Sequence, residues 1–85
     1  MPEICRFYGI IIAMFPQDHN PPHFHVIYNG NKAIVDIQSG TIKGSLPKRA
    51  LHLVCQWLDL HKEELLRNWD KLAAGKEADE IEPLD

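Results

Sequence analysis

The chain has 85 residues, of which 45% are hydrophobic and 25% charged, and its formal net charge is −3. This length leaves room for one domain with one core (1–85), and the composition is that of a globular rather than a disordered chain. The acidic balance argues against a protein that coats nucleic acid without sequence preference, although it leaves room for a local basic patch.

Four segments in the first half of the chain are rich in β-branched and aromatic residues and predict strands: 4–15, 23–28, 32–37 and 41–46. Pro16 ends the first segment, and a loop follows it. Asn29-Gly30 is a strong signal for a hairpin, because a type I′ turn needs positive φ at both central positions. Ser39-Gly40 predicts another turn. We therefore expect a small antiparallel sheet, a meander of three to four strands over 1–46.

The second half predicts helix. Pro47 suits a first helical turn, apolar residues then recur at three- and four-residue spacing, and Gly75 is a plausible stop. One straight helix over 47–74 would be about 40 Å long, whereas a domain of this size is about 25–30 Å wide. We therefore expect two helices, broken near 59–62 and packed on one face of the sheet, in an α+β fold. The acidic tail over 76–85 is expected to be loose, with Ile81 and Leu84 available to dock.

The segment 18–25 reads DHNPPHFH and holds three of the five histidines. Histidine titrates near neutral pH and is the commonest metal ligand. In a strand that starts at His23, His23 and His25 project to one face about 7 Å apart, and His19 could fold toward them from beyond the two prolines. Asp18, His19, His23 and His25 are therefore the candidate catalytic residues.

Three interpretations of this histidine block stay open. His19, His23 and His25 could hold a divalent metal such as zinc, with Asp18 as a fourth ligand or as the acceptor that orients an imidazole. The same imidazoles could make acid–base or phosphate contacts without a metal. Alternatively, the histidines and Asp18 only brace the loop through hydrogen bonds. No cofactor is required by the sequence.

A basic constellation consists of Arg6, Lys43, Lys48 and Arg49. Lys48 and Arg49 open the helical region, where free N–H groups and the helix dipole attract anions. The four residues predict an anion-binding site for RNA or an anionic lipid head group. The alternative is that they are ordinary solvated charges.

Cys5 and Cys55 lie far apart in apolar stretches, which predicts reduced core thiols and fits a cytoplasmic location. Trp57 and Trp69 fall on or next to the apolar helical stripe and are expected in the core. The first residues do not resemble a signal peptide, and the apolar run over 10–15 is too short to span a bilayer.

Several blocks together resemble the small bacterial domain-of-unknown-function family number four-one-six-zero: Met1-Pro2-x-Ile4, Phe7-x-Gly9-Ile10, Asp18-His19-x-Pro21-Pro22-His23-Phe24-His25, Leu46-Pro47-x-Arg49, Trp57 and Glu64-Leu65-x-x-x-Trp69. The likeness runs from Met1 to Leu84, and the histidine block is its most specific part. The resemblance implies the toxin side of a type II toxin–antitoxin pair, with a small antitoxin-like protein encoded nearby. Cys5 departs from the family pattern, in which a serine or threonine is expected.

The resemblance and the residues lead to one function and two alternatives. The first is a toxin that acts through the histidine block and the basic constellation. The second is a non-catalytic module that binds a protein or a phospholipid head group, and a chain this small could also form a homo-oligomer. The third is a metal-dependent hydrolase or nuclease.

Overall fold

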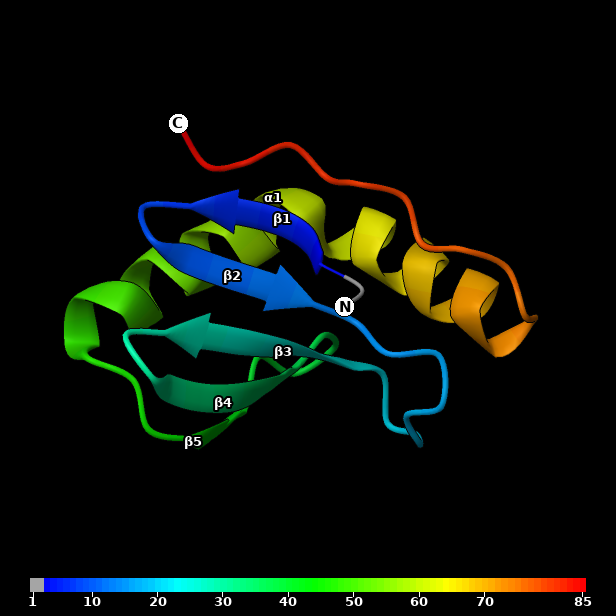
Figure 1. Cartoon of the computed structure of the whole chain (residues 1–85), viewed down its shortest axis with the longest axis horizontal. Coiled ribbons are helices and arrows are strands. Elements are labelled where there is room, and N and C mark those ends of the chain that lie inside the picture. The colour runs from blue at the N-terminus through cyan, green and yellow to red at the C-terminus, as the bar shows by residue number, and fades with distance from the viewer. Residues whose placement is uncertain (1–2) are drawn as a thin grey trace.

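The structure is a computed structural model, and it describes residues 3–85. Met1 and Pro2, which belong to the family pattern quoted above, lie outside the described residues. Five strands precede one long helix (Figure 1): β1 (Glu3–Phe7), β2 (Ile10–Ala13), β3 (His23–Tyr28), β4 (Asn31–Asp36), β5 (Ile42–Gly44) and α1 (Lys48–Ala73). The strands form one antiparallel sheet in the order β1-β2-β3-β4-β5. The α+β class and the meander are thereby confirmed.

The expectation of a single strand over 4–15 is wrong, because this segment forms the β1–β2 hairpin. Tyr8 and Gly9 turn the chain with φ of 50° and 79°, and Phe7 pairs with Ile10 across the turn. Positive φ at both central positions is the geometry of a type I′ turn, which Asn, Asp and Gly favour. Tyr at the first position hides the turn in the sequence. Over residues 3–85 the sheet consequently has five strands rather than three to four.

The hairpin predicted at Asn29-Gly30 is confirmed. The two residues have φ of 47° and 79°, and Tyr28 pairs with Asn31 on either side of them. The last strand is shorter than expected and ends at Gly44, after which the chain passes to the helix.

The second half holds one helix, not the two that were expected. His61 has φ −124° and ψ 19°, so the helix kinks inside the predicted break region but continues beyond it. A straight helix of these 26 residues would measure about 39 Å, and the longest extent of the molecule is 34 Å. The kink therefore lets α1 follow the sheet. Gly75, with φ 79°, ends the helix as predicted, and the Lys76 N–H donates to the Lys71 carbonyl at 2.8 Å.

The core lies between α1 and one face of the sheet. Trp57 is fully buried at its centre, and its ring centroid lies 5.6 Å from that of Phe7 and 5.7 Å from that of Phe24. Cys5 is buried as expected, but Cys55 is exposed. Cys55 directly follows the buried Val54, and one residue turns the helix by about 100°, which carries the thiol away from the core.

The C-terminal tail is docked rather than loose. It runs back along β1 (Figure 1), and the Ile81 N–H donates to the Ile4 carbonyl at 2.9 Å. The indole N–H of Trp57 donates to the Glu82 carbonyl at 2.8 Å. Ile81 is buried and Leu84 packs against the core, so the docking of these two residues is confirmed. Within residues 3–85, no helix combines the length and the apolar character that crossing a membrane requires.

Candidate functional site

The histidine block spans the loop between β2 and β3 and the first half of β3. Because Phe24 and Val26 are buried against α1, the alternation of a strand directs His23 and His25 to the opposite face. The loop returns Asp18 to that face, where the Asp18 N–H donates to the Phe15 carbonyl at 3.3 Å. The Asn20–Pro21 peptide bond in the same loop is cis.

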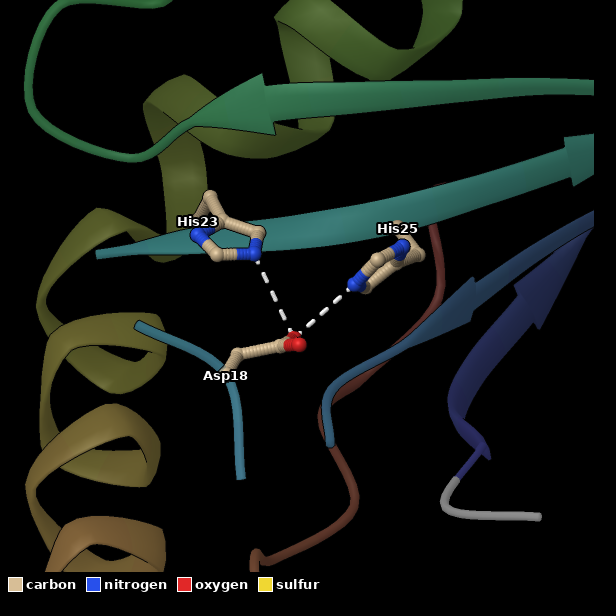
Figure 2. A group of neighbouring side chains, drawn as sticks. All are labelled: Asp18, His23 and His25. Carbon is tan, nitrogen blue, oxygen red and sulfur yellow. Dashed lines mark hydrogen bonds and ion pairs between the residues drawn. The ribbon is translucent and has the colours of Figure 1, made fainter. Parts of the chain in front are cut away.

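Asp18, His23 and His25 meet at one carboxylate oxygen (Figure 2). His25 Nε2 lies 2.9 Å and His23 Nε2 3.3 Å from Asp18 Oδ2. One ligand atom from each of the three residues lies within 4.8 Å of the other two. Their side chains are 24%, 15% and 26% exposed, respectively. We call these three residues the Asp–His cluster; it is half-buried but open to solvent.

The hydrogen on His23 can be placed from its partners. His23 Nδ1 lies 2.8 Å from the Pro21 carbonyl oxygen, and a carbonyl only accepts, so Nδ1 carries a hydrogen. A neutral His23 would then direct the lone pair of Nε2 at the Asp18 carboxylate, which is repulsive. A proton or a metal cation at Nε2 removes this repulsion. The geometry of the Asp–His cluster therefore calls for a positive charge at this nitrogen.

Aromatic side chains hold both imidazoles in place. Phe15 packs edge-on against His25, with ring centroids 4.7 Å apart. The Trp69 ring lies 5.2 Å from that of His23, and its indole N–H donates to Asn20 Oδ1 at 3.2 Å. Trp69 thus joins α1 to the loop of the cluster, besides packing against the core. The sequence placed Trp69 only in the core, because nothing in the helical stripe reveals a contact with a residue 49 positions earlier.

His19 does not join the three residues. It is exposed, and it lines a hollow of about 240 Å³ together with His23 and Lys43. In the part of the chain that the structure describes, Asp18 rather than His19 completes the group of possible metal ligands. The expectation that His19 folds toward His23 and His25 is therefore wrong, and His19 lies on the rim of the hollow.

Asp36 adds a second negative charge near His23, its partner across β3 and β4. The backbone N–H groups of Ser39 and Gln38 donate to Asp36 and lower the pKa of its carboxyl, and His23 lowers it further. Asp36 is therefore ionised at neutral pH, which favours a cation at the His23 end of the Asp–His cluster.

The four basic residues of the predicted anion site are not brought together. Arg6 lies on β1 and pairs with Glu3 at 2.8 Å, whereas Lys43 lies on β5 at the opposite edge of the sheet. Four strand spacings of about 4.8 Å separate these edges. Lys48 and Arg49 are exposed at the start of α1. Of the four, Lys43 is the one that shares a hollow with the Asp–His cluster.

The fold and the site define a small α+β protein in which an antiparallel meander, covered on one face by a helix, carries two histidines and an aspartate beside the second half of that helix. The model of a family described as a domain of unknown function (DUF4160) matches residues 9–70, and the chain belongs to this family. The matched region includes the whole Asp–His cluster and ends before the tail. Comparison with curated proteins and with solved structures gave no match.

Proposed function

We propose that this protein is the toxin-side member of a bacterial type II toxin–antitoxin pair and that the Asp–His cluster is the site through which it acts. The observation that carries the proposal is the convergence of two imidazoles on one carboxylate oxygen in a half-buried, accessible position. A structural role in holding the loop does not require this convergence, because the hydrogen bonds from His23 to Pro21 and from Ile37 to Pro22 already attach the loop to the sheet.

The chemistry that this site favours is directed at an anionic group. Imidazoles transfer protons near neutral pH, and an imidazolium also binds a phosphate oxygen. Lys43 lines the same hollow of about 240 Å³ as His23 and His19, and its positive charge there offsets the negative charge of Asp36, which lines the hollow as well. A phosphate of RNA is the substrate group that we propose. An antitoxin in the cytoplasm would neutralise the protein by covering this hollow.

Growth of cells that express the chain tests the proposal. Expression alone should slow growth, and the neighbouring small protein should restore it. The His23→Ala, His25→Ala double variant should relieve the inhibition, because both imidazoles of the cluster are lost. His52→Ala is the matched control, since His52 is exposed on α1 outside the cluster.

Circular dichroism and the thermal midpoint of the purified variants must show that they stay folded. A folded double variant that inhibits growth as strongly as the original chain would contradict the proposal and make the block a structural brace.

A non-catalytic binding module is the second candidate, because the sheet face opposite α1 is partly apolar. Ile34 is 39% exposed there, and with Ile27, Lys32 and Lys43 it lines a hollow of about 560 Å³. In this case Ile34→Glu should weaken binding of the neighbouring protein, which fluorescence anisotropy with the purified neighbour measures, and expression of the chain alone should leave growth unchanged. Growth of cells that express the chain alone therefore separates the two candidates.

A further inference from the structure

We infer that Asp18, His23 and His25 bind one divalent transition-metal ion, with zinc the best match, and leave a further position for water or an anionic ligand. The inference deepens the proposed function by naming what the Asp–His cluster holds, and it rests on that proposal in treating the cluster as a working site. Metal binding is measured without reference to growth, so the two can fail separately.

The separations between the ligand atoms suit a zinc ion. Tetrahedral zinc with bonds of about 2.0–2.1 Å places its ligand atoms about 3.3 Å apart. Asp18 Oδ2 lies 3.3 Å from His23 Nε2 and 2.9 Å from His25 Nε2, and all ligand atoms of the group fall within 4.8 Å of one another. The three side chains already point toward one another (Figure 2), so an ion between them would require them to adjust their positions but not to change direction.

The orientation of His23 is that of a metal ligand. Its Nδ1–H donates to the Pro21 carbonyl at 2.8 Å, which leaves Nε2 as the nitrogen directed at Asp18. Metal-bound histidines nearly always donate their second ring N–H to a carbonyl or a carboxylate in this way. Trp69 and Phe15 pack against the two imidazoles and limit their rotation.

The donor set selects the kind of metal. Two imidazole nitrogens and one carboxylate oxygen are typical of zinc sites that keep an open position and of related transition metals. Magnesium and calcium prefer oxygen ligands and are not expected here. The open position would face the hollows that His19 and Lys43 line, so a bound anion would reach the metal from this side.

Titration of the purified chain with zinc chloride tests the inference. Isothermal titration calorimetry should give one ion per chain, and magnesium chloride should give no binding. Asp18→Asn, His23→Ala and His25→Ala should each weaken zinc binding by more than the roughly 10- to 100-fold that changing an outer hydrogen-bond partner costs. His52→Ala and Cys55→Ser should bind zinc as the original chain does, because both residues are exposed on α1 away from the cluster.

Nitrogen-15 spectra of the imidazoles give a second readout that needs no variant. Zinc should shift the Nε2 resonances of His23 and His25, and leave those of His19 and His52 unchanged. Absence of binding, equal losses in His52→Ala and His25→Ala, or shifts confined to His52 would overturn the inference. If the chain inhibits growth but does not bind zinc, the metal inference is wrong and the proposed function stands. If the chain binds zinc but does not inhibit growth, the proposed function is wrong and the metal inference stands.

Discussion

Individual residues of the Asp–His cluster carry more than one interaction each. Asp18 Oδ2 accepts a hydrogen bond from His25 and faces Nε2 of His23, while Nδ1 of His23 donates a hydrogen bond to the Pro21 carbonyl. The sequence predicted that residues 18–25 are the chemical centre of the chain, and that His23 and His25 share a face. It could not predict that Asp18 rather than His19 joins them, because the path of the loop decides this and local spacing does not.

The pH dependence of stability should report on Asp36. Backbone N–H groups of Ser39 and Gln38 lower the pKa of its carboxyl below the usual 3.8. A lowered folded-state pKa contributes stability that is present above the unfolded pKa and is lost as pH falls through the folded pKa. Asp36→Asn keeps an acceptor but not the charge, so it should be less stable than the original chain at pH 7.

The difference in unfolding free energy between the two chains should then shrink below about pH 3.8. Urea denaturation between pH 7 and pH 2.5 measures this difference. Glu3, whose pKa is also lowered, is present in both chains, so its contribution cancels in the difference. A difference that stays constant over this range would contradict the role given to the Asp36 charge.

Alanine substitutions at Gly44 and Gly30 distinguish two costs in the free energy of unfolding: the clash of an added Cβ and the strain of a positive φ. Both have positive φ, but a Cβ at Gly44 would lie 2.6 Å from the Lys32 carbonyl oxygen, whereas nothing lies within 4 Å of one at Gly30. Gly30→Ala should cost about 1–2 kcal/mol of stability from backbone strain alone. Gly44→Ala should cost at least about 3 kcal/mol, because the clash adds to the strain. Equal losses in urea denaturation would show that the β4–β5 contact is looser than described.

At the level of elements, the sequence predicted whether a segment is a strand or a helix better than it predicted where each element begins and ends. The β3–β4 hairpin and the end of the helix were predicted because Asn-Gly and Gly75 supply the backbone geometry that they need. The Tyr8-Gly9 turn was missed because an apolar run surrounds it. The kink at His61 fell in the expected region, but helix length and polarity alone do not distinguish a kink from a complete break.

Asn68 joins the tail to α1. Its side chain is buried, its amide N–H donates to the Asp79 carbonyl, and its Oδ1 accepts from the Asp79 N–H, both at 2.9 Å. Asn68→Asp has the same shape but replaces the donor with a second oxygen facing a carbonyl. It should cost about 2–3 kcal/mol of stability and speed amide exchange at Asp79 and Ile81.

Hydrogen exchange followed by mass spectrometry measures this effect. Arg67→Ala changes the exposed neighbour and is the control. Unchanged exchange in the tail of Asn68→Asp would mean that Ile81 and the other tail contacts hold the segment without Asn68.

In the molecule as a whole, the two faces of the sheet have different roles. One face packs on α1 and supplies the core, and the other face presents an apolar hollow. The Asp–His cluster lies at the end of the sheet where Trp69 of α1 contacts His23. The sequence could not predict that Arg6 and Lys43 lie at opposite edges, since this follows from the strand order and the additional hairpin. Any anionic ligand is therefore expected beside Lys43 and the cluster, and not at one patch of four basic residues.

The central claim is that Asp18, His23 and His25 form a functional site that binds a cation. A crystal structure of the protein crystallised with zinc, in which anomalous scattering locates the metal, tests this claim most directly. We expect a single strong peak about 2.0–2.2 Å from Asp18 Oδ2 and from both imidazole nitrogens. Crystals saturated with zinc that show no peak between these atoms, with His25 still donating to Asp18, would contradict the account.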